Sequence, residues 1–281
     1  MAKISFLNGE FIEHSKAMVH IDDRAMQFAD SVYEVTLVHN NKLIDGELHW
    51  QRLMNSLEKM KIRINYTVEQ LDDFARQLIR QNDIVTGSLY IQITRGVAPR
   101  NQLLPENIKP TVIMTISEFK LPVAEILDKA VKTISQPDIR WQMCDVKSTG
   151  LLIGSLYKQK AADANCDDVI MLRDNVVTEC CFSNIFIVKD QQLITHLLDN
   201  HILAGITRHR IIELAKQVDI KVIERKFKFD ELLEADEVFS SSTTTFVRPI
   251  HIVDNQMIKD GATGRVTREL FNSYLKFVQS T

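Results

Sequence analysis

One lysine stands in an apolar stretch of the sequence. Lys147 lies within Asp138–Leu152 (DIRWQMCDVKSTGLL), a segment that also contains Trp141, Met143 and Val146. A partly buried ammonium group has a lowered pKa, so its amine would be usable as a nucleophile at neutral pH. A solvated lysine fits the same pattern, and the residues alone leave both interpretations open.

Two further side chains of opposite charge are candidates for a site. Glu179 ends an apolar hairpin arm in Val176–Cys181 (VVTECC), where a carboxylate could point into a cleft or lie on its rim. Arg52 falls on the side of its helix away from Trp50 and Leu53. Helical periodicity alone therefore predicts a solvated arginine.

A third candidate is an anion site at the start of a helix. Within Asn200–Arg210 (NHILAGITRHR), Gly205 comes directly before an amphipathic helix. The first-turn amides, at Ile206 and Thr207, have no partner within the helix and could hold an anion. A glycine in this place can also be an ordinary cap or turn residue.

A run of hydroxyl groups follows a predicted strand near the end of the chain. Ser240–Thr245 (SSSTTT) contains Ser242 and Thr243 and offers six hydroxyls. Such a run suits an anion-binding cup. An exposed loop at the end of a strand accounts for it equally well.

The elements that must position these residues differ between the two halves of the chain. The N-terminal part opens with a hairpin, Lys3–Leu7 and Glu10–Ile12, around the turn Asn8-Gly9. Apolar spacing then predicts a helix from Trp50 to Met60. The remaining expected elements are a helix at Glu69–Gln81 and strands at Ser88–Thr94 and Thr111–Ser117, joined by the loop Arg95–Pro110.

The pattern breaks at a proline in Glu118–Glu125, where a domain boundary is expected. Helices and strands alternate beyond it, which predicts two α+β domains with mixed sheets. The expected strands are Asp168–Leu172, Asn184–Val188, Lys221–Arg225, Glu237–Ser240 and Pro249–Val253. The expected helices are Leu151–Ala164, Thr207–Val218 and Arg265–Val278.

The composition of the chain limits the kinds of molecule that it can bind. Thirty-four basic and 37 acidic residues among 281 give a net charge of −3, with no long block of one sign. Such a chain has no field to hold nucleic acid or an anionic membrane, so we expect small-molecule ligands. There is no metal-ligand spacing, nucleotide-loop motif or serine-hydrolase motif. The four cysteines form no disulfide framework, and with no apolar signal or membrane segment we expect a cytoplasmic protein.

Taken in order, these segments resemble the class IV aminotransferases, the fold-type IV pyridoxal-phosphate enzymes, and among them the bacterial D-amino acid transaminases. The similarity runs nearly from end to end. The segments that carry it are Asp22–Val35 (DDRAMQFADSVYEV), Arg52 in HWQRL, Thr94–Pro105 (TRGVAPRNQLLP), Asp138–Leu152, Thr178–Asn184 (TECCFSN), Leu203–Arg208 (LAGITR) and Ser240–Thr244.

The resemblance implies a mixed α+β fold of two domains and the cofactor pyridoxal 5′-phosphate. Residues 1–120 would form a smaller N-terminal domain, and residues 121–281 a larger domain that binds the cofactor. Lys147 would carry the cofactor as a Schiff base and then shuttle the substrate proton. Glu179 would pair with the ring nitrogen and keep it protonated.

The resemblance also assigns the phosphate and the substrate. A guanidinium fork and a helix N-terminus suit a dianion. The phosphate-binding residues would be Arg52, Ile206, Thr207, Ser242 and Thr243. The substrate carboxylate would be held by Tyr33 and Arg100, together with Gln102. In that family the arginine loop comes from a second subunit, so the resemblance implies a homodimer with its active site near the subunit interface.

One departure and one competing similarity bear on the reaction. The family's Arg-x-His is here Arg100-Asn101-Gln102, which replaces a group that can carry charge by a neutral amide. The TECC run at Thr178–Cys181 is similar to one in aminodeoxychorismate lyases, whereas Tyr33-Glu34 and Arg100 are transaminase-like. We therefore expect an aminotransferase that acts on D-alanine-like amino acids with a 2-oxo acid such as 2-oxoglutarate. The alternatives are a lyase that forms 4-aminobenzoate and pyruvate, and a non-catalytic protein that binds pyridoxal phosphate.

Overall fold

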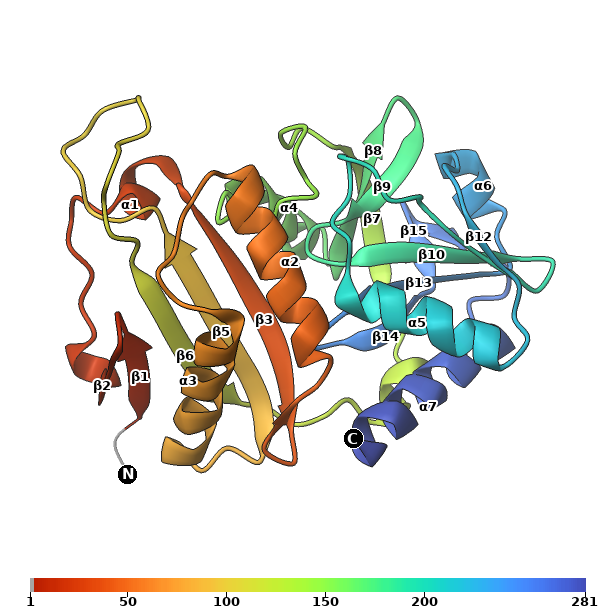
Figure 1. Ribbon diagram of the computed structural model, residues 1–281. Helices are drawn as coiled ribbons and strands as arrows, with labels where there is room; N and C mark the ends of the chain where they lie inside the picture. Colours follow the sequence, from red (N-terminus) through yellow and green to blue (C-terminus); the bar gives the residue numbers. More distant parts are fainter. Residues whose placement is uncertain (1–2) are drawn as a thin grey trace. The chain divides into compact units, whose positions relative to one another are not determined.

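The computed structural model describes residues 3–281, which form two compact units (Figure 1). The first unit contains residues up to Leu121, the short segment Val146–Gly150 and Thr281. The second contains Pro122–Asp145 and Leu151–Ser280. Both units combine helices with sheets, as the sequence predicts. The assignment of residues 1–120 and 121–281 to different functions stays a prediction, because compactness does not say which part binds a cofactor.

The first unit is built on one antiparallel sheet of six strands, in the order β2-β1-β6-β5-β3-β4. Its long central strands pair over their whole length, with Tyr33 opposite Gln92 and Glu34 opposite Ile91. The strands are β1 (Ile4–Leu7), β2 (Glu10–Glu13), β3 (Ser31–His39), β4 (Lys42–Leu43), β5 (Thr86–Thr94) and β6 (Val112–Glu118).

Two helices, α2 (Gly46–Lys59) and α3 (Val68–Gln81), cover one face of this sheet (Figure 1). Their apolar stripes, which include Leu53 and Leu78, meet the inward-facing side chains of β5, among them Leu89 and Ile91. These side chains are removed from water, which supplies the main stabilisation of the unit. A 3-10 turn η1 (His14–Lys16) and a short helix α1 (Arg24–Phe28) complete it.

The segment Val146–Gly150 runs beside the first half of β3. Tyr33 N donates to Lys147 O at 3.0 Å, and Val32 and Ser148 form an antiparallel bridge. Val146 is buried in the core of the first unit. These contacts fix the backbone that carries Lys147.

The second unit contains two five-stranded sheets, with strand orders β12-β11-β10-β13-β14 and β16-β15-β7-β8-β9. The first of these includes β10 (Asn184–Lys189), β11 (Gln192–Thr195), β12 (Val222–Glu224), β13 (Glu237–Ser242) and β14 (Phe246–Ile250). The other includes β7 (Lys132–Pro137), β8 (Asp168–Arg173), β9 (Val176–Cys180), β15 (Ile252–Val253) and β16 (Gln256–Met257). The helices are η2 (Ala124–Asp128), α4 (Leu152–Asp163), α5 (Ile206–Gln217), α6 (Phe229–Leu233) and α7 (Arg265–Ser280).

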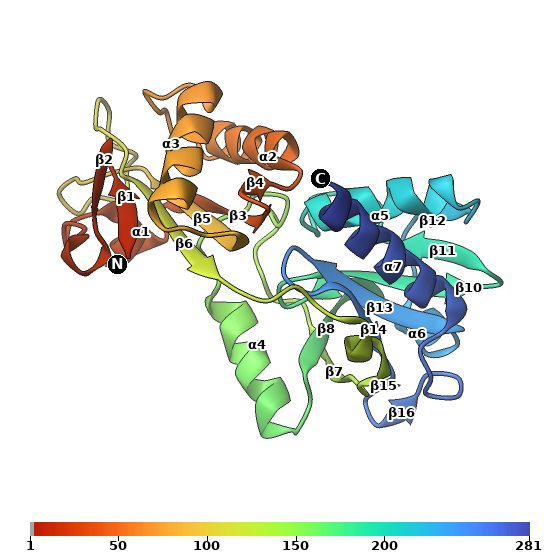
Figure 2. The same cartoon turned by 90° about the horizontal axis from the view of Figure 1, so that it is seen from below.

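The two sheets share one apolar core and carry helices on their other faces. Ile170 and Val177 of one sheet pack with Ile185 and Val238 of the other. Helix α4 packs against β7 and β8, while α5 and α7 contact each other and cover β13 (Figure 2). Because strand side chains alternate between faces, both faces of each sheet are occupied.

One predicted strand is wrong. Pro249–Val253 is divided at His251, so that β14 belongs to one sheet and β15 to the other. The His251 and Ile252 amides both donate to Val131 O, which draws the chain out of the first sheet and towards β7. The apolar run gives no sign of this exchange. Among residues 3–281 no helix is long and apolar enough to cross a membrane.

Candidate active site

The amine of Lys147 lies over an aromatic ring of the first unit. Its Nζ is 4.4 Å from the centroid of the Tyr33 ring, within range of a cation–π contact. The Lys147 side chain is half-buried. The sequence leaves open whether this lysine is solvated, and the structure places it against β3.

The Tyr33 side chain lies on the face of the sheet opposite to that of Glu34, because neighbouring strand residues alternate. Its ring is 5.7 Å from that of Tyr90, whose hydroxyl donates to Gln92 Oε1 at 2.8 Å. The Gln92 amide donates in turn to Ser31 Oγ at 3.2 Å. Thr149 Oγ1 lies 2.5 Å from Ser31 Oγ, so the hydrogen-bonded chain returns to the segment that carries Lys147.

Arg52 is paired inside the first unit rather than solvated, so the interpretation from periodicity is wrong. Its Nε and Nη2 atoms each donate to one oxygen of Glu34 at 2.7 Å, a bidentate geometry. Glu34 is fully buried, and the Arg52 side chain is 10% exposed. His49, one turn earlier on α2, places Nδ1 2.8 Å from Glu34 Oε2.

The charges of this cluster, Glu34, Arg52 and His49, follow from its burial. Burial by itself raises the pKa of Glu34, but the charge and hydrogen bonds of Arg52, helped by His49, lower that pKa to about 2. Burial lowers the pKa of His49, so its imidazole is neutral at pH 7 and donates Nδ1–H to the ionised carboxylate. Glu34 therefore fixes Arg52 as a cation with a set orientation.

Arg100 and Gln102 lie on an exposed loop of the first unit. Arg24 donates to Asn101 O at 2.6 Å, and the same guanidinium pairs with Asp30 at 2.7 Å. Arg100 packs over the ring of Phe28, with 5.3 Å between its Cζ and the centroid. The loop is therefore tied down, although both predicted carboxylate ligands face outwards.

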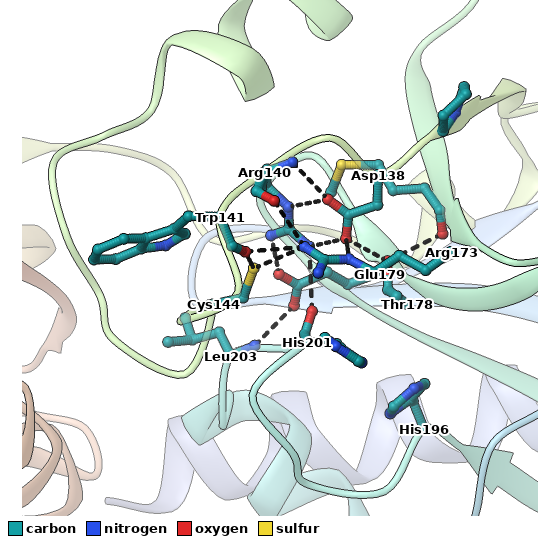
Figure 3. Close-up of polar contacts among 12 residues, drawn as sticks. Asp138, Arg140, Trp141, Cys144, Arg173, Thr178, Glu179, His196, His201 and Leu203 are labelled. Carbon is teal, nitrogen blue, oxygen red and sulfur yellow. Dashed lines mark hydrogen bonds and ion pairs between the residues drawn. The ribbon is translucent and has the colours of Figure 1, made fainter.

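Glu179 lies on β9 of the second unit and is 5% exposed. Its Oε2 accepts from Leu203 N at 3.1 Å, and its Oε1 accepts from Arg140 Nη1 (Figure 3). Oε2 also accepts from Asn184 Nδ2 at 3.2 Å. Burial raises the pKa of this carboxyl, while the Arg140 charge opposes the rise. The carboxylate is thus held in place from both sides.

The start of α5 has no side chain of its own to cap it. Gly205 is the N-cap residue, and a Cβ there would lie 2.0 Å from Asn184 Oδ1, so any larger residue would displace the Asn184 side chain. The Asn184 amide also donates to Leu203 O at 2.9 Å. Asn184 thereby links Glu179 to the chain that leads into Ile206 and Thr207.

The hydroxyl run lies at the β13–β14 connection of the second unit. Ser242 Oγ is 2.8 Å from Thr245 Oγ1 and accepts from Thr245 N at 3.3 Å, and Thr243 stands in the turn between them. Ser241, which the prediction omits, is paired in register with Asn184 and is 2% exposed. Its hydroxyl has no hydrogen-bond partner within the described part of the chain. An uncapped helix start near an unpartnered buried hydroxyl fits an anionic ligand.

The predicted residues therefore fall into two sets. Tyr33, Arg52, Arg100, Gln102 and Lys147 belong to the first unit, and Glu179, Ile206, Thr207, Ser242 and Thr243 to the second. The structure joins Lys147 with Tyr33, and Glu179 with the start of α5. Sequence reasoning missed the residues that hold these groups: Glu34, His49, Asp138, Arg140 and Asn184. A glutamate on the core face of a strand is a usable signal, because a buried carboxylate requires a partner.

Comparisons with known proteins agree with this picture. The family model described as amino-transferase class IV matches residues 31–253. The D-alanine aminotransferase of Staphylococcus epidermidis (strain RP62A) is 38% identical over 281 residues, which covers 100% of this chain and 99% of the relative. The D-alanine aminotransferase of Listeria monocytogenes (strain 10403S) is 39% identical over 272 residues, which covers 96% of this chain and 94% of the relative.

Solved structures share the fold. The branched-chain amino acid aminotransferase of Escherichia coli superimposes with a TM-score of 0.91 at 25% identity, covering 98% of this chain and 94% of that one. A second branched-chain amino acid aminotransferase, solved with pyridoxamine 5′-phosphate, gives a TM-score of 0.93 at 24% identity, covering 100% of this chain and 95% of that one. The likeness therefore extends over both units, each with its own sheets.

Proposed function

The chain belongs to the class IV aminotransferase family, and from this premise we propose that it transfers the amino group of D-alanine to a 2-oxo acid such as 2-oxoglutarate. It is an enzyme that uses pyridoxal 5′-phosphate. The observation that carries the proposed reaction is the similarity to D-alanine aminotransferases, which extends over the whole chain and 99% of the first relative.

We propose that the residues of the two sets divide the work on this cofactor. When bound, the cofactor supplies an electron sink for the charge left on Cα after deprotonation. Lys147 Nζ would hold the cofactor and, when free of it, would carry the proton between Cα of the substrate and the cofactor carbon. Glu179 accepts a hydrogen bond from the ring nitrogen and holds a proton there.

The phosphate is a dianion, and it is proposed to bind both a charged guanidinium and neutral N–H and O–H donors. Arg52 supplies a guanidinium that Glu34 has already oriented. The amides at the start of α5 and the hydroxyl run supply neutral donors. The proposed phosphate-binding residues are Arg52, Ile206, Thr207, Ser242 and Thr243.

Tyr33, Arg100 and Gln102 are proposed to bind the substrate carboxylate, and thereby to decide which face of Cα meets Lys147. Arg100 and Gln102 are exposed on their own unit, which supports a homodimer in which this loop serves a second subunit. A cytoplasmic location is also proposed, supported by four cysteines that are all free thiols.

The experiment that tests this function separates the two halves of a transamination. D-Alanine alone should convert the bound cofactor to its pyridoxamine form, seen by absorbance, with one pyruvate released per site. Added 2-oxoglutarate should restore the starting spectrum, and L-alanine should react far more slowly. An unchanged spectrum with D-alanine, together with acceptor-independent turnover of aminodeoxychorismate to pyruvate and 4-aminobenzoate, would establish the lyase instead.

A further inference from the structure

A guanidinium lies between two buried carboxylates in the second unit (Figure 3). Arg140 donates from Nε to Asp138 Oδ1 at 2.9 Å and from Nη2 to Asp138 Oδ2 at 2.7 Å. Its remaining amino group, Nη1, donates to Glu179 Oε1. The planar fork therefore fixes Glu179 relative to Asp138.

Asp138 is itself immobilised on the far side of this guanidinium. Its side chain is fully buried, Thr178 Oγ1 donates to Oδ2 at 2.9 Å, and Arg173 Nε lies 3.2 Å from the same oxygen. The Arg140 and Arg173 charges lower the pKa of Asp138 to about 2, although burial opposes them. Asp138 is thus a permanent anion that orients Arg140.

The two oxygens of Glu179 are unequally occupied. A carboxylate offers about four acceptor positions, two on each oxygen. Leu203 N and Asn184 Nδ2 both donate to Oε2, whereas among residues 3–281 Arg140 alone donates to Oε1. The remaining position on Oε1 is therefore the one that an additional N–H donor can use.

We propose that Arg140 is a positioning residue that keeps Glu179 ionised and presents Oε1 to the protonated ring nitrogen of pyridoxal 5′-phosphate. This inference rests on the proposed function, in which Glu179 is the partner of that nitrogen. Arg140 does not touch the reacting atoms in it. It acts through Glu179.

The sign of the effect follows from electrostatics. The proton shared by carboxyl and ring nitrogen can sit on nitrogen, giving an ion pair, or on oxygen, giving a neutral pair. Arg140 contacts the carboxylate and is therefore nearer to it than to the nitrogen, so its charge stabilises the anion more than it destabilises the ring cation. Loss of that charge moves the proton towards oxygen and weakens the ring as an electron sink.

The test follows the ring nitrogen directly. Wild type, Arg140→Gln, Arg140→Lys and Arg173→Gln are reconstituted with pyridoxal 5′-phosphate labelled with ¹⁵N in the ring, and the ¹⁵N chemical shift is followed between pH 6 and 9. The cofactor dissociation constant is measured in parallel. Arg173→Gln is the matched control, because it removes one positive charge beside Asp138, together with the Nη2 hydrogen bonds to Arg140 O and Trp141 O, and keeps the Arg140 guanidinium and Glu179.

We expect a protonated ring nitrogen throughout in wild type and in Arg173→Gln. Arg140→Gln should show the unprotonated signal, with the rate of the D-alanine half-reaction lowered about tenfold or more and its KM nearly unchanged. Arg140→Lys keeps a cation but loses the planar fork, so its ¹⁵N signal should lie between those of wild type and Arg140→Gln. A protonated signal in Arg140→Gln, or equal loss of protonation in Arg173→Gln, would overturn the proposal.

Two further outcomes are decisive. If Arg140→Gln does not take up cofactor, Arg140→Lys decides, since a signal identical to that of wild type would contradict the role of the fork. If wild type itself binds no cofactor, or binds it without reacting with D-alanine, the proposed function fails. If wild type is active and the ring nitrogen in Arg140→Gln is still protonated, the role of Arg140 is contradicted and the proposed function is not.

Discussion

The two units each contain a buried carboxylate–arginine cluster, and the two clusters differ in which partner orients the other. In the first unit, Glu34 takes three hydrogen bonds from Arg52 and His49, and its pKa falls to about 2. In the second unit, Arg140 directs its donors to Asp138 and Glu179, and the pKa of Glu179 is raised. The carboxylate orients an arginine in one case, and the arginine orients a carboxylate in the other.

The difference shows that an ion pair does not by itself reveal which partner serves a ligand. Glu34 and Glu179 each accept three hydrogen bonds, so the number of bonds does not separate their roles. The proposed function does, because it assigns the phosphate to Arg52 and the ring nitrogen to Glu179. In that proposal Glu34 supports Arg52, and Arg140 supports Glu179.

Lys147 belongs to neither cluster, so its replacement separates the chemistry from its support. Lys147→Ala should lower transamination of D-alanine by about four orders of magnitude or more, because the base and the cofactor linkage are lost together. The free energy of unfolding should change little, since both clusters remain. Borohydride reduction of the wild type followed by peptide mapping checks the assignment, and a label on another lysine would contradict it.

Replacement of Glu179 should have the next largest effect on the rate of the D-alanine half-reaction. Glu179→Gln should slow the D-alanine half-reaction about a hundredfold while cofactor affinity falls much less, because a neutral amide cannot hold a proton on the ring nitrogen. Stopped-flow absorbance measures the rate, and Glu234→Gln, at an exposed ion pair, is the control. Equal rates in the two variants would exclude Glu179 as the ring partner.

Replacement of the supporting carboxylate should act on stability and binding instead. Glu34→Gln leaves the Arg52 cation buried beside a neutral amide, which should cost about 3 kcal/mol in the free energy of unfolding and weaken cofactor binding about tenfold or more. Urea unfolding and cofactor titration measure the two effects. Glu58→Gln, at an exposed position on α2, the helix that carries Arg52, should change neither.

The difference in the free energy of unfolding between wild type and Glu34→Gln should depend on pH with a definite sign. The pKa of Glu34 is lowered from 4.5 to about 2, so this carboxylate stabilises the fold above pH 4.5 and loses its contribution as pH falls towards 2. The stability gap between wild type and Glu34→Gln should therefore be full at pH 7 and shrink below pH 4.5. A gap that stays constant down to pH 3 would show that Glu34 is not held ionised by Arg52.

The sequence predicts the elements of the fold far better than it predicts these clusters. The helix expected at Glu69–Gln81 is α3 (Val68–Gln81), because a continuous apolar stripe marks both of its ends. Strand β3 is missing from the expected elements, although it carries Tyr33 and Glu34, because a charge at a core-facing position interrupts the alternation that marks a strand.

The sequence pattern does not predict which residues pair with the site residues. Glu34 and Arg52 are 18 positions apart, and Arg140 and Glu179 are 39 apart, so only the folded chain brings them together. The ligands themselves are named from family resemblance. Their roles stay predictions, whereas the enzyme class is confirmed by the family match over residues 31–253.

The smallest effect is expected outside both clusters, on the exposed loop. Gln102→His restores a group that can carry charge beside Arg100, and a charge-assisted hydrogen bond exceeds a neutral one by about 1 kcal/mol. The KM for D-alanine should therefore fall severalfold, with kcat nearly constant. Steady-state kinetics at pH 6 and 8 check this, and unchanged values at both would remove Gln102 from the carboxylate site.

The most direct test of the opposed roles measures two quantities on the same two variants. For Glu34→Gln and Glu179→Gln, the cofactor dissociation constant and the rate of the D-alanine half-reaction at saturating cofactor are compared with wild type. We expect a crossed result, in which Glu34→Gln chiefly raises the dissociation constant and Glu179→Gln chiefly lowers the rate. If both variants change both quantities in the same proportion, the division between a supporting and a working carboxylate is contradicted.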